Sequence, residues 1–304
     1  MKKIFVVGSL NMDLTIATKV LPARGMTVEG SGFLSTPGGK GANQAVASAK
    51  LGAKTYMVGA VGSAFGDELV SSLRASGADT RFIMREEGVS SGIAVIIVEQ
   101  GDNRIILDKG ANARVNAALV ERALSEAERG DILIVQLEIN ADTVAYALRL
   151  AKEKGMTTVL NPAPAAEIDE SAFENADYFM PNQTETQFYT GIYPDTLDSA
   201  RAAADILLKK GVKNVIITLG AEGSFFASKG DEYSVKALPV KVVDTTAAGD
   251  TFVGAFAVKL SEGAGAREAM QFANAASAAA VTKRGAQISI PTRKEAEELL
   301  RNRK

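Results

Sequence analysis

Residues 244–252 read Asp-Thr-Thr-Ala-Ala-Gly-Asp-Thr-Phe, where a strand-like run at 233–243 gives way to a helix-like run at 252–260. The small residues at this junction fill no core volume, but they let the backbone come close to another molecule. Free N–H groups at the start of a helix bind anions such as phosphate. The carboxylate of Asp250 is then placed to take a proton from a hydroxyl that attacks the phosphate. This stretch therefore predicts a phosphoryl-transfer site centred on Asp250.

The amino-acid composition excludes several kinds of chemistry. The 304 residues include 46% hydrophobic and 23% charged side chains, which is ordinary for a globular protein. The chain has neither Cys nor His, which excludes thiol nucleophiles, disulfides, Ser-His-Asp triads and Cys/His zinc sites. Acid–base chemistry must then use carboxylates, Lys or Tyr. The formal net charge of −2 argues against a nucleic-acid partner, because such a partner needs a concentrated basic face.

The hydropathy pattern gives no sign of a membrane protein or of a targeting segment. No run approaches the roughly 18 apolar residues of a membrane span. The apolar run at 4–7 is far shorter than the hydrophobic region of a signal peptide, and the polar Ser9 and Asn11 follow it at once. We therefore expect a soluble cytoplasmic protein that has no membrane partner.

Strand-like and helix-like runs alternate along most of the chain. This alternation predicts parallel βαβ units and an α/β fold with a doubly wound, mostly parallel sheet flanked by helices. We expect one domain over residues 1–304. The expected strands lie at 4–7, 56–61, 132–137, 157–160, 178–180 and 215–219. The expected helices lie at 45–51, 67–75, 116–128, 141–154, 184–190, 196–210, 266–281 and 293–300.

Two β inserts, at about 13–36 and 92–108, interrupt this alternation. The first is broken by Pro and Gly residues. The second reads as a hairpin around the turn Gly101-Asp102-Asn103. Together the inserts predict a small separate sheet, which could cover the site as a lid or pair with another subunit.

A glycine-rich stretch precedes the helix expected at 45–51. Gly38, Gly39 and Gly41 permit positive φ and a close backbone approach, while Lys40 and Asn43 offer hydrogen-bond donors. The spacing is not that of a P-loop. A tight turn before a helix needs fewer glycines, so we interpret the stretch as a binding loop.

Polar residues gather at the carboxyl ends of the expected strands, where open α/β sheets bind ligands. Taken singly, each has a structural explanation. Asn11 and Asp13 could shape a loop as Asx-turns, Glu138 could cap the next helix, and Glu185 suits a first helical turn. Seven such residues on one rim nevertheless predict a site. They are Asn11, Asp13, Glu138, Asn161, Asn182, Glu185 and Thr218.

Four motifs occur in a fixed order: Gly38–Asn43, Pro181–Glu185, Thr218–Gly223 and Asp244–Asp250. On these motifs the chain resembles the ribokinase family of carbohydrate kinases over residues 8–291. Within the family, the form Ala247-Ala-Gly-Asp250 resembles that of the ribokinases. The segments Asn161-Pro-Ala-Pro-Ala165, Gly110-Ala-Asn112 and Gly285-Ala-Gln287 point the same way. Gln183 departs from the usual Glu, but Asn182 and Glu185 are intact.

The resemblance implies a role for each matched residue at the acceptor side of the site. Asp250 would be the general base that deprotonates the 5-hydroxyl of ribose, and the amides of Ala247, Ala248 and Gly249 would stabilise the transferring phosphoryl group. The residues implied to bind the sugar hydroxyls are Asn11, Asp13, Gly39, Lys40, Asn43 and Glu138.

The resemblance also implies ATP, Mg²⁺ and a monovalent cation, K⁺. Glu185 would help place Mg²⁺, through water. The residues implied to contact ATP are Asn182, Thr218, Leu219, Gly220, Ala221, Glu222, Gly223, Gly249 and Asn274. The residues implied to bind K⁺, several of them by backbone carbonyls, are Asp244, Thr246, Ala280, Lys283, Gly285 and Ser289.

These inferences give an expected function and leave rivals open. The expected function is ATP-dependent phosphorylation of ribose to ribose 5-phosphate by a homodimer joined through the lid sheet. One rival is a kinase of another small sugar or a nucleoside, and another is a sugar-binding regulator without catalysis. A dinucleotide-binding dehydrogenase is disfavoured, because the segment after Gly8 lacks the Gly-x-Gly-x-x-Gly pattern.

Overall fold

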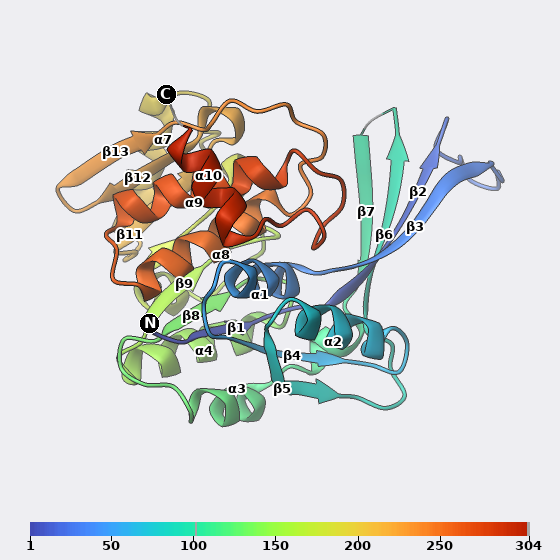
Figure 1. Cartoon of the computed structure of the whole chain (residues 1–304), viewed down its shortest axis with the longest axis horizontal. Coiled ribbons are helices and arrows are strands. Elements are labelled where there is room, and N and C mark those ends of the chain that lie inside the picture. The colour runs from blue at the N-terminus through green and yellow to red at the C-terminus, as the bar shows by residue number, and fades with distance from the viewer. Residues whose placement is uncertain (101, 303–304) are drawn as a thin grey trace.

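The computed structural model describes residues 1–100 and 102–302, and a nine-stranded sheet runs through the centre of this part (Figure 1). Its strands are β1 (Ile4–Val7), β4 (Thr55–Val61), β5 (Asp79–Arg85), β8 (Ile132–Val135), β9 (Thr157–Leu160), β10 (Tyr178–Phe179), β11 (Asn214–Thr218), β12 (Ser224–Ser228) and β13 (Asp231–Val235). They follow the order β13-β12-β11-β10-β9-β8-β1-β4-β5. The strands from β11 to β5 are parallel, whereas β12 and β13 form an antiparallel edge. The predicted doubly wound, mostly parallel sheet is confirmed.

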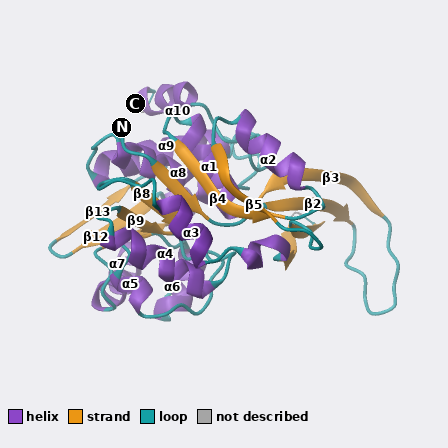
Figure 2. Cartoon of the chain, turned by 90° about the horizontal axis from the view of Figure 1, so that it is seen from below, coloured by secondary structure: helices purple, strands orange, loops and turns teal. Residues whose placement is uncertain are grey.

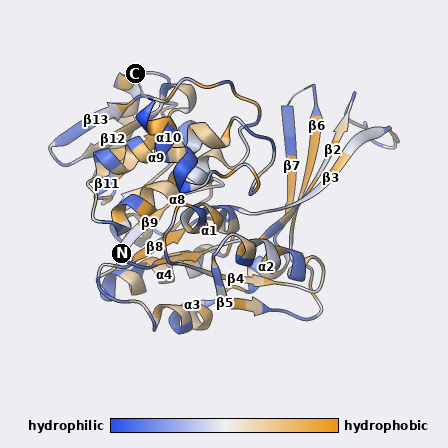
Figure 3. Cartoon of the chain, in the orientation of Figure 1, coloured by the Kyte–Doolittle hydropathy of each residue, from blue (hydrophilic) through white to orange (hydrophobic). Residues whose placement is uncertain are grey.

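Helices cover both faces of this sheet. Successive residues of a strand point to opposite faces, and in the central strands both sets of side chains are apolar. In β1, Ile4 and Val6 pack into one core, and Phe5 and Val7 pack into the other. Both cores are apolar, as the colour of the central strands in Figure 3 shows. The helices of the first face are α1 (Lys40–Lys50), α2 (Gly66–Ala75), α8 (Ala248–Ser261), α9 (Ala266–Ala280) and α10 (Arg293–Arg301). Those of the second are α3 (Ala117–Leu124), α4 (Ala141–Glu153), α5 (Ser171–Glu174), α6 (Gln183–Thr190) and α7 (Leu197–Lys209).

The two β inserts form a small separate sheet, as expected. Its strands are β2 (Asn11–Thr18), β3 (Gly30–Gly38), β6 (Gly92–Glu99) and β7 (Asp102–Asp108), in the order β3-β2-β6-β7. The small sheet projects from one side of the molecule (Figures 1 and 2). Of the turn predicted for its hairpin, Gly101 lies outside the described residues.

The strand expected at 233–243 is wrong beyond Val235. Strand β13 pairs only with β12, and Val235 lies opposite Ser224, the first residue of β12. The chain beyond Val235 therefore has no neighbouring strand, and residues 236–247 form neither strand nor helix. Helix α8 begins at Ala248 rather than at 252, which places Asp250 in its first turn.

Two other boundaries near the site also differ from the expectation. Helix α1 begins at Lys40 rather than at residue 45, so most of the glycine-rich stretch is the start of a helix. Asn11 and Asp13 lie at the beginning of β2, not in a loop. The 3₁₀ turns η1 (Gly110–Arg114) and η2 (Gly220–Glu222) complete the described elements. None of the described helices combines the length and the apolar character that a bilayer span requires.

Helices α1 and α8 pack closely at Gly254. A β-carbon built at this glycine would lie 2.7 Å from the Ala47 Cβ atom and 3.0 Å from the Gln44 backbone oxygen. Such distances are below van der Waals contact, so only Gly permits this approach of the two helices. The approach brings side chains of α1 to the start of α8.

We predict that the substitution Gly254→Ala lowers the free energy of unfolding by about 1–3 kcal/mol, because the added methyl group forces the two helices apart. Urea unfolding followed by circular dichroism measures this. The comparison variant is Gly265→Ala at the N-cap of α9, where nothing lies within 4 Å of the added atom and we expect a smaller loss, of up to about 1 kcal/mol, from the weaker cap alone. Equal stability of the two variants would contradict the close packing.

Candidate active site

Asp250 is buried in the first turn of α8, with 8% of its surface exposed. Two amides from α1 hold its carboxylate: Asn43 Nδ2 donates to Oδ2 at 2.9 Å, and Gln44 Nε2 donates to Oδ1 at 3.0 Å. Burial raises the pKa of Asp250, although Lys40 and these two amides act in the opposite direction. A buried carboxylate with a raised pKa is suited to accept a proton from a bound hydroxyl.

The start of α8 offers backbone N–H groups beside this carboxylate. Ala247 precedes the helix in a left-handed conformation, with φ 60°. The Ala248 amide donates to the Thr245 carbonyl at 3.2 Å. Those of Gly249 and Asp250 donate to no residue in the part of the chain that the structure describes. Gly249 is exposed. A phosphate could therefore reach these N–H groups, as it does at other helix starts.

A second group of polar side chains lies around Glu138, where β1 and β8 end. Glu138 Oε2 accepts hydrogen bonds from Ser9 Oγ at 2.5 Å, from Asn11 Nδ2 at 3.3 Å and from the Lys40 amide at 3.1 Å. Gly39 makes the last contact possible, because its φ of 88° starts α1 beside the backbone of Asn11. The end of β1, the start of β2 and the start of α1 thus meet at one carboxylate.

Asp13 lies near this group in an unusual electrostatic environment. Burial raises the pKa of Asp13 to about 7, and the charges of Glu138 and Asp250 act in the same direction, whereas Lys40 opposes them. No hydrogen bond to Asp13 from the described residues offsets the burial. A buried carboxylate without a donor can accept hydrogen bonds from a polar ligand.

Lys40 is the cation that balances these acids. Burial by itself lowers the pKa of Lys40, but the surrounding carboxylates outweigh this effect, so that its pKa is raised. Those carboxylates are Asp250, Glu138, Glu185 and Asp13. Lys40 therefore stays charged between the two groups of polar side chains.

Asn182 and Glu185 form a reciprocal cap at the start of α6. The Glu185 amide donates to Asn182 Oδ1 at 2.8 Å, and the Asn182 amide donates to Glu185 Oε2 at 2.9 Å. Burial raises the pKa of Glu185. The amide of Thr218 donates to the Pro181 carbonyl, which places the end of β11 beside this cap.

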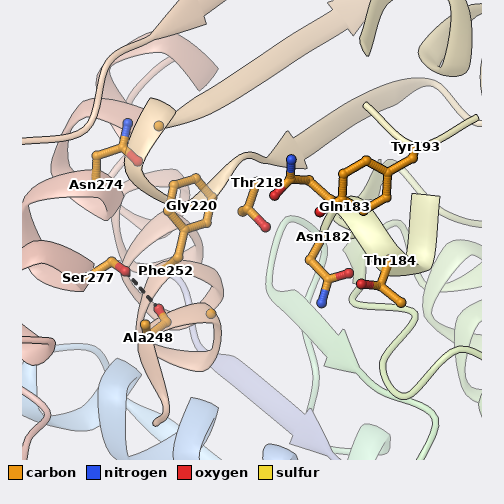
Figure 4. A pocket seen from close by; sticks show the side chains of 12 residues that line it. Asn182, Gln183, Thr184, Tyr193, Thr218, Gly220, Ala248, Phe252, Asn274 and Ser277 are labelled. Carbon is orange, nitrogen blue, oxygen red and sulfur yellow. Dashed lines mark hydrogen bonds between the residues drawn. The ribbon is translucent and has the colours of Figure 1, made fainter. Parts of the chain in front are cut away.

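Three adjoining pockets extend away from Asp250. The first, of about 210 Å³, lies between Lys40, Glu185 and Asp250. The second, of about 340 Å³, shares Asn182, Thr218 and Gly249 with the first (Figure 4). The third, of about 600 Å³, shares Asn274 and Ser277 with the second and is mainly apolar. A long ligand with one polar end and one apolar end fits such a series.

Most of the predicted site residues lie together in this region. Leu219 and Glu222 are exceptions, since neither lines the second or the third pocket. Asn274 uses its amide nitrogen within the protein, on Ser224 Oγ at 3.2 Å and the Val235 carbonyl at 3.0 Å. It still lines the second and third pockets.

Several site residues were missed from the sequence. Tyr193, Phe252 and Ser277 line the second pocket (Figure 4), and Ser277 Oγ donates to the Ala248 carbonyl at 3.0 Å. The third pocket takes its apolar wall from residues 237–242 and from α9. The strand-like pattern at 233–243 predicts a strand, so these apolar residues gave no sign of a ligand site.

The chain is similar to several known proteins. A family model described as pfkB family carbohydrate kinase matches residues 1–293. The chain belongs to this family. It is 41% identical to a ribokinase of Schizosaccharomyces pombe, over 96% of each chain, and 38% identical to a deoxyribokinase of Salmonella typhi, over 98% of each. A solved structure of Arabidopsis thaliana ribokinase, complexed with ribose and ATP, has 32% identity and a TM-score of 0.90, with 98% of each chain covered.

In this kinase, the residues expected to bind K⁺ lie on two adjacent loops, except Ala280, which is the last residue of α9. Asp244 joins them, because Oδ1 accepts from the Thr246 amide at 2.9 Å and Oδ2 accepts from the Gly285 amide at 2.9 Å. Burial tends to raise the pKa of Asp244, but these donors lower it overall, so the carboxylate is ionised. Carboxylate and carbonyl oxygens suit a hard cation such as K⁺. Lys283 instead directs its ammonium group to Glu295 Oε1 at 2.6 Å.

The residues around Glu185 fit Mg²⁺ only with help from a ligand. The described residues contain no group of three or more His, Cys, Asp or Glu that could hold a metal ion. Magnesium commonly binds through one or two carboxylates, several waters and the phosphates of a substrate. Glu185, next to the first pocket, is compatible with that mode.

The raised pKa of Asp13 predicts a pH dependence of folding stability. The carboxyl group of Asp13 has a pKa of about 7 in the folded protein, whereas the ordinary value is 3.8. Protonation of Asp13 therefore favours the folded state. This contribution to the free energy of unfolding is fully present below the ordinary pKa and is lost as the pH rises to about 7. We expect the free energy of unfolding of the wild type to fall, relative to that of Asp13→Asn, over this range and to level off above it. Urea unfolding of both proteins at several pH values measures the difference. If the difference in free energy of unfolding between the two proteins did not change with pH, the raised pKa of Asp13 would be contradicted.

Proposed function

We propose that this kinase transfers the γ-phosphoryl group of ATP to the 5-hydroxyl of D-ribose and forms ribose 5-phosphate. The observation that carries the proposal is the position of the buried Asp250 carboxylate. It lies at a helix start that offers N–H groups, between a cluster of hydrogen-bonding side chains and the series of pockets. The ribokinase relatives favour ribose as the acceptor.

The sugar would lie on the side of Glu138 and Asp13. Carboxylates accept hydrogen bonds from sugar hydroxyls, and amides such as those of Asn11 and Asn43 can donate or accept. Lys40 and the backbone of Gly39 complete this side of the site. A small cavity of about 100 Å³ next to Asn11 and Glu138 supports this placement.

Asp250 would act as the general base. Its raised pKa keeps it a stronger base than an exposed carboxylate, so it can take the proton from the 5-hydroxyl as the oxygen attacks phosphorus. The N–H groups at 247–250 would stabilise the charge on the transferring phosphoryl group. Of these, the Ala248 amide contributes less, because it already donates to Thr245.

ATP would extend through the second and third pockets. Its phosphates would lie near Asn182, Thr218 and Gly249, and its purine would occupy the apolar third pocket between residues 237–242 and α9. Mg²⁺, held through water by Glu185, would offset the phosphate charge. K⁺, bound at Asp244 and the loop around Gly285, would hold the start of α8 in shape.

The small sheet would serve both as a lid and as a contact between two subunits. It exposes large apolar side chains: Phe33 is 66% exposed and Ile106 is also 66% exposed. Exposed apolar strands mark surfaces that bind a partner. A homodimer joined through this sheet, in the cytoplasm, is part of the proposal.

A second candidate is a kinase of 2-deoxyribose, which the Salmonella typhi deoxyribokinase relative favours at 38% identity. The two sugars differ only at the 2-hydroxyl. A site that hydrogen-bonds this hydroxyl discriminates strongly against the analogue that lacks it. Glu138 and Asp13 are the groups available to do so.

The first experiment is an assay of ADP release with ATP, Mg²⁺ and a panel of ribose, 2-deoxyribose, fructose and adenosine. We expect the highest kcat/KM for ribose, and we expect Asp250→Asn to lower kcat by about 10²-fold or more, because the base is lost. A higher kcat/KM for another acceptor would overturn the specificity.

The matched control for this assay is Asp231→Asn, an exposed carboxylate at the start of β13, which should keep normal turnover. The same assay with choline in place of K⁺ should give a lower kcat. Equal rates in the two salts would contradict the cation site. A sugar-binding regulator would release no ADP with any acceptor.

The proposed dimer contact through the small sheet can be tested separately. Ile105 and Ile106 are neighbours on β7 and expose apolar side chains on opposite faces of the small sheet. We expect the wild type to sediment as a dimer at micromolar concentration, and one of the variants Ile105→Asp and Ile106→Asp to sediment as a monomer. The variant that dissociates identifies the face in contact. A monomeric wild type, or two variants that both remain dimeric, would refute the contact.

A further inference from the structure

Asp250 is connected to the central sheet by a row of buried amides. Gln44 Nε2 donates to Asp250 Oδ1 at 3.0 Å and to Asn161 Oδ1 at 3.0 Å. Gln136 Nε2 donates to Gln44 Oε1 at 2.6 Å. Gln44 and Gln136 are fully buried, and Asn161 is 9% exposed. We call Gln44, Asn161 and Gln136 the amide row.

The backbone fixes the orientation of each amide in the row. The Met180 carbonyl can only accept, so the Asn161 amide nitrogen faces it at 2.8 Å and the Asn161 oxygen faces Gln44. The Gln44 nitrogen must then donate both to Asn161 and to Asp250, which uses its two hydrogens. The Gln44 oxygen is left to accept from Gln136. A single arrangement of the row is therefore compatible with Met180 and Asp250.

Keeping the row costs stability. Gln136 Oε1 is buried and has no hydrogen-bond partner among the described residues. Leaving such an acceptor without a partner costs about 1–3 kcal/mol. Apolar side chains at 44 and 136 would avoid this cost, but they would leave Asp250 Oδ1 and Asn161 Oδ1 without the Gln44 donor, so the row is explained by the contacts of Gln44 with these two oxygens.

We propose that Gln44 is a positioning residue for Asp250 and that Gln136 and Asn161 hold it in place. The proposal rests on the proposed function, in which Asp250 is the base. Gln44 fixes the plane of the carboxylate through Oδ1, so that the free lone pairs meet the substrate hydroxyl in one orientation. Because the side-chain amide is neutral and does not ionise at ordinary pH, it does this without taking over the acid–base role.

The same contact also favours the ionised form of the base. Burial raises the pKa of Asp250, and the hydrogen bond from Gln44 is one of the interactions that lower it. A base must be ionised at the working pH and still bind a proton in the transition state. Removal of the Gln44 donor therefore leaves Asp250 protonated up to a higher pH.

The test is the substitution Gln44→Met, which keeps the volume and removes the amide. With ribose and ATP as substrates, we expect kcat to fall about 10- to 100-fold through misplacement of the base. The acid limb of the pH profile of kcat/KM should move to higher pH, so the loss is larger near about pH 6 than near about pH 9. The KM for ATP should stay within about twofold, because Gln44 does not line the nucleotide pockets.

Two further variants complete the design. Gln136→Met leaves Gln44 in place but removes its support, so we expect a smaller shift of the acid limb in the same direction. It also keeps the test decisive if Gln44→Met does not fold. Gln187→Met is the matched control, because Gln187 is exposed on α6 and should leave both kcat and the pH profile unchanged.

The outcomes separate this inference from the proposed function. If Asp250→Asn is inactive while Gln44→Met and Gln136→Met keep the wild-type kcat and acid limb, the positioning role is wrong and the function stands. An equal loss at every pH would also refute it, because a purely structural defect does not move the limb. If Asp250→Asn keeps normal turnover, the proposed base itself is wrong.

Discussion

Asp250 is buried among neighbouring acids, and the packing of two helices brings to it the groups that favour its ionised form. The groups that lower its pKa, Lys40, Asn43 and Gln44, all come from the first turns of α1. Their spacing of i, i+3 and i+4 places them on one face of that helix. The close approach at Gly254 presents this face to the start of α8. The position of the proposed base is thus a consequence of how two helices that are far apart in the sequence pack together.

The charges of the site are divided according to what each end has to bind. Carboxylates lie where hydroxyls of a neutral sugar would donate, at Asp13 and Glu138. Backbone N–H groups lie where phosphates would bind, at Gly249 and Asp250. Lys40 lies between the two ends, and its raised pKa reflects the surrounding acids. In the proposed mechanism this division leaves no task for a His, because one carboxylate would accept the proton and amides would stabilise the phosphate charge.

Much of this could be read from the sequence, and the rest depended on contacts between distant segments. Buried strands such as β1 and β8 were predicted because short apolar runs mark them. The run at 233–243 looks equally strand-like, but β12 offers no residue to pair beyond Val235, so the chain lines a pocket instead. Gln44 and Gln136 were missed because a buried amide gives no periodic signal. Their role depends on Asp250 and Met180, which are distant in sequence.

The register of the small sheet places Asp13, a proposed sugar-binding residue, on the same face as a residue that lines the site. Asp13 pairs with Ala94, and Ala94 pairs with Leu107, so these three side chains share one face. Leu107 lines the small cavity beside Asn11 and Glu138. The sheet that is proposed to cover the sugar would therefore also carry Asp13, one of the residues proposed to bind it. A sugar that binds Asp13 must favour the position of the sheet that brings Asp13 and Leu107 to Glu138, because a ligand shifts a conformational equilibrium by its differential affinity. In this proposal binding and closure would be one event, and any contact that fixes the small sheet would also change the affinity for the sugar.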